Sequence, residues 1–95
     1  MRDLDRIIHE PARLQIVALL AAVKEADFLF LQRETALTKG NLSSHLGKLE
    51  ETAYVEIEKT FRGKIPLTVV RLTPKGRVAF TEYRKALNGL MRKSQ

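Results

Sequence analysis

Apolar positions recur along this chain with a spacing that changes near residue 54, and the change separates helical from extended segments. From Pro11 to Val23 the apolar residues follow a helical spacing, which predicts a long first helix that opens on proline. Ahead of it, Leu4, Ile7 and Ile8 also keep a helical spacing. They predict a helical turn, or a helix kinked near Pro11, whose exposed apolar side chains would seek a partner.

Two further helices are predicted between residues 28 and 52. The run from 28 to 36 predicts a second helix with Asp27 as its N-cap. Thr38 is a good N-cap for a third helix over about 38–52, in which leucines 42, 46 and 49 share one face. The opposite face is small and polar, and its members are Gly40, Asn41, Ser43, Ser44, Gly47, Lys48 and Glu51. Because each glycine weakens an isolated helix by roughly 1 kcal/mol relative to alanine, we expect this face to admit a bulky partner at close range.

From Tyr54 the spacing of apolar residues becomes two, which predicts a hairpin over about 54–72. We place its turn around residues 62–66, where Gly63 lies between two cations. Thr73 and Pro74 then form a cap followed by proline at the first helical position, so a final helix is expected over about 74–92. The expected fold is mainly α with a small β-hairpin.

The composition bounds the class of protein. The chain has 95 residues, 44% of them hydrophobic and 29% charged, which indicates one globular domain spanning residues 1–95. No stretch approaches the ~18 to 20 unbroken apolar residues of a membrane span, and the first ten residues lack the apolar core of a secretory signal. A cytoplasmic protein without membrane contact is the simplest expectation. The absence of cysteine excludes disulfides, thiolate catalysis and cysteine-based metal sites.

Charge is distributed unevenly along the chain. Residues 1–58 hold seven Lys or Arg and ten Asp or Glu, whereas residues 59–95 hold ten Lys or Arg and only Glu82, within a formal net charge of +6. This division favours a polyanionic partner for the C-terminal half, because neutralising phosphates and releasing counterions supplies most sequence-independent affinity for DNA. The alternative is a basic, solvated final helix.

Residues 41–51 (NLSSHLGKLEE) and 72–77 (LTPKGR), with the predicted order of elements, resemble the small winged-helix transcriptional regulators related to the MarR and ArsR groups. Residues 9–14 are similar to the opening of the first long helix in those families, and residues 61–68 to their wing. The resemblance implies a winged helix-turn-helix that dimerises through its N- and C-terminal helices. It also implies that the third helix enters a major groove of double-stranded DNA, with the wing beside the backbone or in the minor groove. Such a dimer would read two half-sites about one turn, ~10 bp, apart.

The implied function is sequence-specific regulation of transcription by a homodimer. Repression is favoured over activation, because occupancy alone blocks polymerase. The residues expected to form the dimer are apolar and lie at both termini: Leu4, Ile7, Ile8, Tyr83, Leu87, Leu90 and Met91.

The chain departs from the family pattern in two places. Where these families usually end the recognition helix with glycine, it has Ala53, which must accept a left-handed backbone or end the helix differently. It also stops soon after the final helix and lacks the cysteine clusters of many ArsR-like metal sensors. We therefore expect no cofactor and no separate ligand-sensing domain, and the sequence identifies no small-molecule effector.

Ten residues of the third helix and the wing are our candidates for DNA contact: Thr38, Lys39, Asn41, Ser43, Ser44, His45, Lys48, Arg62, Lys64 and Arg71. Asparagine suits an adenine edge, serine reaches bases or phosphates, and lysine contacts phosphate or guanine. Alternatives stay open. Asn41 and Ser43 could simply satisfy the first turn of the helix, Arg71 could be a surface charge, and His45 lies at the edge of the buried stripe, where it packs or bonds phosphate.

Neither a catalytic nor a metal site is expected. No nucleophile, base and orienting group can be named, phosphate-loop and metal motifs are absent, and His9 has no partner pattern. The stronger rival is a winged helix used for protein–protein interaction without sequence-specific DNA binding. It is supported by acidic residues beside the expected DNA face, namely Glu50, Glu51, Glu56 and Glu58. DNA affinity that falls steeply with salt would separate the two functions.

Overall fold

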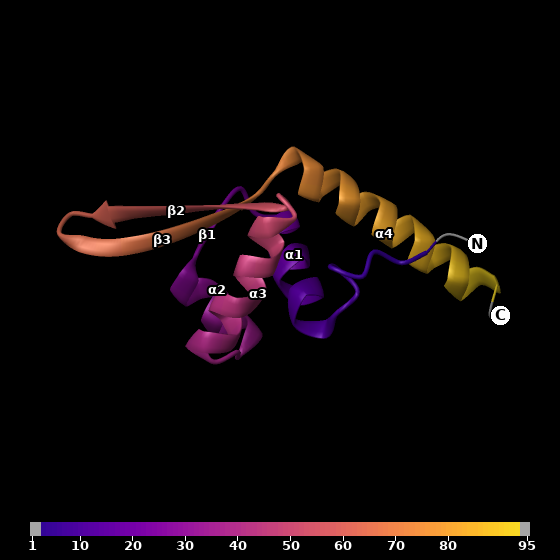
Figure 1. Cartoon of the computed structure of the whole chain (residues 1–95), viewed down its shortest axis with the longest axis horizontal. Coiled ribbons are helices and arrows are strands. Elements are labelled where there is room, and N and C mark those ends of the chain that lie inside the picture. The colour runs from indigo at the N-terminus through magenta and orange to yellow at the C-terminus, as the bar shows by residue number, and fades with distance from the viewer. Residues whose placement is uncertain (1–2, 94–95) are drawn as a thin grey trace.

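The protein, seen in a computed structural model that describes residues 3–93, combines four helices with a three-stranded antiparallel sheet in that range. The elements are α1 (Pro11–Ala22), β1 (Ala26–Asp27), α2 (Phe28–Thr35), α3 (Lys39–Glu51), β2 (Val55–Arg62), β3 (Ile65–Leu72) and α4 (Pro74–Lys93). Figure 1 shows α1, α2 and α3 gathered at the centre, with the β2–β3 hairpin projecting to one side and α4 to the other. The predicted winged-helix fold is confirmed.

Side-chain caps fix where the first three helices begin. Asp27 and Thr38 cap α2 and α3 as predicted, since their side-chain oxygens accept backbone N–H groups three residues on, at 2.8 and 3.1 Å. Glu10, which the sequence analysis did not single out, caps α1 in the same way at 2.7 Å, and Pro11 occupies the first helical position. These bonds satisfy N–H groups that have no partner inside the helix.

The C-terminus of α3 resolves the question raised by the missing glycine. Ala53 adopts a left-handed backbone with φ of 63°. Its N–H donates to the carbonyl of Glu50, and the N–H of Tyr54 donates to the carbonyl of Leu49, both at 2.9 Å. This is the pair of bonds that normally closes a helix on glycine. Alanine therefore occupies the position where glycine is usual, in a conformation that costs an L-residue roughly 1–2 kcal/mol.

The wing, which we define as β2, its turn and β3, is paired without interruption from Val55 opposite Leu72 to Arg62 opposite Ile65. Its turn is shorter than predicted. Only two residues form it, and the first, Gly63, has φ of 64°, as two-residue hairpins favour because positive φ matches the twist of the strands.

The sheet also contains a third strand that the sequence analysis did not predict. β1 has only two residues, Ala26 opposite Val70 and Asp27 opposite Val69. It lies on the side of β3 away from β2, so the strand order is β1-β3-β2. This contact ties the base of the wing to the start of α2.

One hydrophobic core joins α1, α2, α3 and the base of the wing. Its fully or nearly buried members include Ile16, Val17, Leu20, Leu31, Leu42, Leu46, Leu49, Val55, Val70 and Leu72. The outer half of the wing contributes nothing to this cluster, and its residues 61–66 are all exposed.

The segment before α1 packs onto this chain itself, which corrects one expectation. Asp5 accepts the N–H groups of Ile7 and Ile8 through one carboxylate oxygen, at 2.8 and 3.2 Å, and so holds a turn rather than a helix. Ile8 is 0% exposed, so the prediction that its side chain is exposed at this terminus was wrong. A 2.8 Å hydrogen bond between His9 Nδ1 and the Tyr83 hydroxyl attaches the segment to α4.

The start of α4 is joined to the end of α3 by close backbone contacts. Thr73 donates its N–H to the carbonyl of Tyr54 at 3.0 Å and its hydroxyl to the carbonyl of Ala53 at 2.6 Å. The same hydroxyl accepts the N–H of Gly76 at 2.9 Å. A Cβ at Gly76 would lie 2.2 Å from the Tyr54 oxygen. Only glycine permits this approach, and the angle of α4 depends on it.

Candidate nucleic-acid interface

The outward face of α3 is open, as the sequence predicted. Leu42, Leu46 and Leu49 are at most 2% exposed and hold α3 against the rest of the core. The other side is exposed or half-buried and consists of Lys39, Gly40, Asn41, Ser43, Ser44, Gly47, Lys48 and Glu51. A Cβ at Gly40 or Gly47 would meet no atom within 4 Å. Neither glycine is therefore required by packing among the described residues.

The Thr38 cap satisfies a backbone N–H in the first turn of α3, which was the alternative role considered for Asn41 and Ser43. The Thr38 hydroxyl accepts the N–H of Asn41 at 3.1 Å, so this hydroxyl is engaged in capping. Within the described part of the chain, the side chains of Asn41 and Ser43 have no hydrogen-bond partner. Both are exposed and are free to meet an outside group.

A groove of about 740 Å³ separates the outward face of α3 from the wing. Its walls come from Lys39, Ser43, Gly47 and Glu50 of α3, from Ile57, Lys59, Pro66, Leu67 and Thr68 of the wing, and from Phe28, Leu29 and Gln32 of α2. Lys59 was not among our predicted contacts. It shares a strand face with Val55 and Ile57 but is exposed, because this part of the wing lies beyond the hydrophobic core. The groove brings Lys39 and Lys59 to one concave surface.

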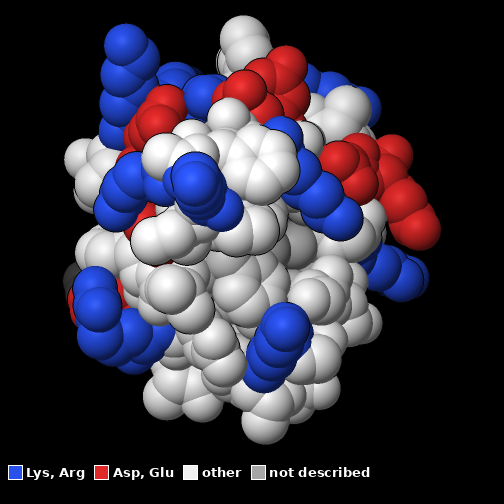
Figure 2. Space-filling model, turned by 90° about the vertical axis from the view of Figure 1, so that its left-hand side faces the viewer, with Lys and Arg blue, Asp and Glu red and all other residues white. Residues whose placement is uncertain are grey.

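The tip of the wing carries unpaired positive charge. Arg62 and Lys64 are exposed, and neither forms an ion pair with an acid in the range 3–93. Figure 2 looks onto this end of the molecule, where Lys and Arg side chains project around an uncharged area. Two large apolar side chains are also exposed at the end of the wing, Phe61 at 67% and Ile65 at 68%.

His45, a predicted DNA contact, lies on the inner side of α3. Arg13 of α1 donates from Nη1 to His45 Nδ1 at 3.1 Å and from Nε to the carbonyl of Ile7 at 2.6 Å. Because arginine only donates, this bond assigns the ring proton to Nε2. The Glu10 carboxylate lies 3.9 Å from the same nitrogen. In this conformation His45 connects α3 to α1 and to the N-terminal segment rather than facing outward.

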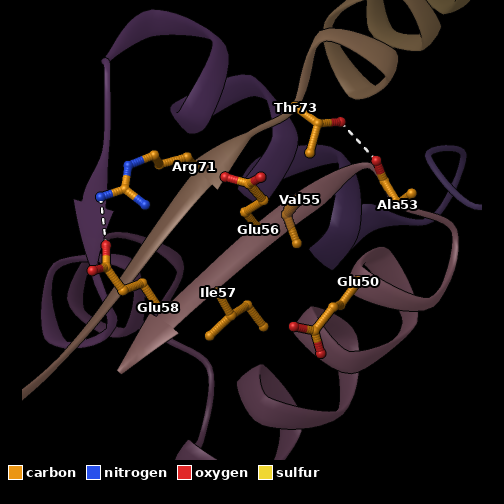
Figure 3. Close-up of a pocket in the computed structure, with 8 residues that line it drawn as sticks. All are labelled: Glu50, Ala53, Val55, Glu56, Ile57, Glu58, Arg71 and Thr73. Carbon is orange, nitrogen blue, oxygen red and sulfur yellow. Dashed lines mark hydrogen bonds and ion pairs between the residues drawn. The ribbon is translucent and has the colours of Figure 1, made fainter. Parts of the chain in front are cut away.

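Arg71, also a predicted DNA contact, is engaged inside the chain. It forms ion pairs with Glu58 at 2.7 Å and with Glu25 at 3.2 Å. Figure 3 shows the Glu58 pair beside a shallow pocket of about 580 Å³, which Glu50 and Glu56 also line. The hydrogen bond that Arg71 donates to the Glu58 carboxylate raises the pKa of Arg71 above its ordinary value. Arg71 therefore ties the wing to the segment before β1, and its contact with DNA stays a prediction.

Tyr54 stabilises the junction between the N-terminal segment and the wing. Its hydroxyl donates to Asp5 at 2.5 Å. Burial, together with this hydrogen bond and the negative charge of Asp5, raises the pKa of Tyr54 from 10.0 to about 12. The phenol is neutral over the physiological range and acts as a structural donor.

Comparisons with known proteins decide the family. Residues 12–91 match the family described as the winged helix DNA-binding domain. The chain belongs to the winged helix DNA-binding domain family. It is 40% identical over 79 residues to an uncharacterized protein of Methanocaldococcus jannaschii, a match that covers 82% of this chain and 85% of that protein.

Solved structures agree with the family. The transcriptional regulator homologue of Pyrococcus horikoshii OT3 is 30% identical and superposes with a TM-score of 0.90, over 96% of this chain and 90% of that one. Rv0081 of M. tuberculosis shares the fold, with 21% identity and a TM-score of 0.79, over 94% of this chain and 86% of that one. The resemblance to small winged-helix regulators that was read from residues 41–51 and 72–77 is confirmed.

The residues predicted to form a dimer divide into two groups in this winged-helix domain. Ile8 and Tyr83 are buried within the chain, at 0% and 3% exposure. Leu4, Ile7, Leu87 and Leu90 are half-buried, whereas Met91 is 58% exposed. The first group is covered by this chain itself, and the second group leaves apolar surface for a second chain.

Residues 3–93 contain no group of three or more His, Asp or Glu placed to hold a metal ion. None of the helices in that range is both long and apolar enough to cross a membrane.

Sequence reasoning missed Gly76 as a structural residue. The signal was present, because a glycine in the first turn of a helix carries the same cost as those in α3. What the sequence does not contain is the distance between this position and the Tyr54 carbonyl, which only the fold supplies.

Proposed function

We propose that this protein is a sequence-specific double-stranded DNA-binding regulator of transcription that acts as a homodimer and represses by occupancy. The observation that carries the proposal is the outward face of α3. It presents small and hydrogen-bonding side chains with two glycines that this chain does not need for packing. The wing beside it ends in unpaired cations. A helix of this kind fits a major groove, whose edges are read by short polar side chains at close range.

The contacts divide by chemistry. Asn41, Ser43 and Ser44 are exposed on the first half of α3, where they are suited to base edges. Lys39 and Lys48 of α3 and Arg62 and Lys64 of the wing are exposed cations and are suited to phosphates. Thr38 caps the first turn of α3. His45 and Arg71 stabilise the positions of α3 and the wing through contacts within the chain.

The proposed dimer forms through α4. This helix has 20 residues, or about 30 Å at 1.5 Å per residue, and Figure 1 shows its C-terminal half lying beyond the three-helix core. Leu87 and Met91 lie there with apolar surface unburied. A second copy of the chain would cover this surface and place two α3 helices on one side of a duplex, about one turn apart.

The test of DNA recognition uses variants with different expected effects. Selection from a random duplex library should yield a motif with two related half-sites. Ser44→Ala should relax the preference at one position of each half-site, since a good base contact contributes ~1–3 kcal/mol of discrimination. Arg62→Ala should weaken binding to all sequences equally and lower the slope of log affinity against log salt by about 1 per site.

The rival function would show itself in the same experiment. Glu50, Glu56 and Glu58 line the pocket next to the wing, and an interaction module could use this acidic surface. If the wild type shows no duplex binding even at low salt, sequence-specific regulation is wrong and the interaction module takes its place.

The mass of the protein in solution tests the proposed dimer. Light scattering at micromolar concentration should give twice the chain mass for the wild type. Leu87→Glu with Met91→Glu should give the monomer mass, while Val23→Glu, a change at another partly exposed apolar residue, should leave the dimer intact. A monomeric wild type would contradict the proposal.

A further inference from the structure

The outer end of the wing has an unusual distribution of side chains. Phe61 pairs with Pro66 and Arg62 pairs with Ile65 across the hairpin. Paired residues lie on the same face of a two-stranded ribbon, and successive residues on opposite faces. Each face of the tip therefore carries one large apolar side chain, Phe61 on one and Ile65 on the other.

These apolar side chains make no contribution to the core of the protein. Phe61 is 67% and Ile65 is 68% exposed, and neither belongs to the hydrophobic cluster or to the residues packed against it. A solvated hairpin tip would ordinarily carry polar residues at both positions, since exposed apolar surface costs about 25 cal/mol per Å² in water. A partner that covers the tip would remove this cost.

The charges beside the tip indicate the chemical class of the partner. Arg62 precedes the turn and Lys64 lies in it, whereas Lys59 lies three residue pairs further in from Arg62. All three are exposed. Among residues 55–66, the two acids, Glu56 and Glu58, lie near the base of the wing, where Glu58 is paired with Arg71. The outer half is thus cationic and apolar together, which complements a polyanion that also offers apolar surface. Duplex DNA does so where base pairs are unstacked.

We propose that the wing tip is an apolar wedge that enters the minor groove, inserts Phe61 or Ile65 at a base step and bends the DNA. The inference rests on the proposed function, because it assigns to the wing a specific act on the same DNA. Proteins that bend DNA from the minor groove use Phe, Leu or Ile side chains in this way, with cations on the neighbouring phosphates. Pyrimidine–purine steps unstack most readily and are the expected targets.

The shape of the tip suits this entry. The whole ribbon is wider than the ~6 Å minor groove of straight DNA, so only the tip residues enter, at a base step that the wedge itself unstacks and kinks. Gly63 at the turn has positive φ and no side chain, and a Cβ there would meet nothing within 4 Å, so the leading edge of the hairpin is narrow. Pro66 has no N–H to leave unpaired, and the exposed cations Arg62 and Lys64 at the tip are suited to the phosphates that border the groove.

The experiment measures unstacking and bending separately from affinity. A duplex carrying the selected motif holds 2-aminopurine at a TA step in the flank that the wing would reach, and a second duplex carries a donor and acceptor dye at its ends. On binding the wild type, 2-aminopurine fluorescence should rise at least about twofold and the dye-to-dye distance should shorten, as a kink at the step requires. Phe61→Ser with Ile65→Ser should abolish both signals and weaken binding about tenfold, the size expected for losing one stacked contact.

Three controls keep the result specific. Phe61→Tyr preserves an aromatic ring and should keep both signals. Val78→Ser removes an apolar side chain of similar exposure, 63%, from α4 and should change neither. Thermal unfolding and light scattering of the double serine variant should match the wild type, because both side chains are exposed in the monomer.

Each result has one interpretation. Tight, sequence-specific binding without fluorescence change or bending would overturn the wedge while leaving the regulator intact. No binding of the wild type to any duplex would overturn the proposed function and the wedge with it. A fall in oligomer mass in the double serine variant would mean that the tip docks on a second copy of the chain, and would also overturn the wedge.

Discussion

Replacing a glycine by alanine should have opposite effects at two positions of this fold. At Gly47, in the middle of α3, the added Cβ meets nothing within 4 Å, so alanine should stabilise the protein by about 1 kcal/mol through helix propensity alone. At Gly76 the Cβ would lie 2.2 Å from the Tyr54 oxygen and 2.9 Å from a methyl carbon of Leu72. Relief would require α4 to move, with loss of the 3.0 Å bond from Thr73 to that oxygen. The cost of overpacking and of that bond together is about 2–4 kcal/mol.

The assay is urea unfolding of both variants and the wild type under identical conditions. A free energy of unfolding higher for Gly47→Ala and much lower for Gly76→Ala would support the reasoning. Duplex binding then adds a second readout at Gly47. If α3 enters a major groove, Gly47→Ala should bind several-fold more weakly although it is more stable, and Gly47→Leu more weakly still. Destabilisation by Gly47→Ala would refute the structural argument. So would a free energy of unfolding of Gly76→Ala that differs from that of the wild type by less than about 0.5 kcal/mol, which is the usual scatter of neutral surface changes.

The remaining predictions concern stability. Ala53→Gly and Ala36→Gly should each stabilise the protein by about 1 kcal/mol in thermal melts, because both alanines have left-handed backbones, φ 63° and 58°; unchanged melting would contradict this. Tyr54 has a folded pKa of about 12 against 10.0 when unfolded, so its hydroxyl contributes stability below pH 10 that is lost as the pH rises toward 12. The stability advantage of the wild type over Tyr54→Phe should therefore shrink across that interval, and a constant difference would count against the assignment. Arg71→Ala should lower stability only slightly, since its ion pairs are partly exposed and screened by solvent, and should reduce duplex affinity less than Arg62→Ala does.

Local signals were sufficient to predict most of the fold. The caps Asp27 and Thr38, the three leucines of α3 and the alternation after Tyr54 each depend on residues a few positions apart, and each was confirmed. The hairpin turn was placed correctly but drawn too wide, because the pattern locates Gly63 without showing how many residues close the turn.

The errors and omissions arise from contacts between distant segments. β1 has two residues and exists only because Val69 and Val70 of β3 lie beside it. Arg71 was predicted to contact phosphate or to be a surface charge, and its bonds to Glu58 and to Glu25, which is 46 residues away, were not anticipated. Ile8 and Tyr83 were assigned to a dimer because an apolar stripe on a terminal helix does not say whether its own chain or another chain covers it.

The central claim is that α3 and the wing bind duplex DNA, and a salt titration tests it most directly. Affinity for the selected duplex should be measured at about 50 and about 200 mM salt for the wild type and for Lys48→Ala with Arg62→Ala. We predict that wild-type affinity falls by about 10³-fold or more over this range, as six or more phosphate contacts in a dimer require. The double variant should bind more weakly at both concentrations and with a shallower slope. Binding that is absent at low salt, or that is the same in the two proteins, would contradict the account.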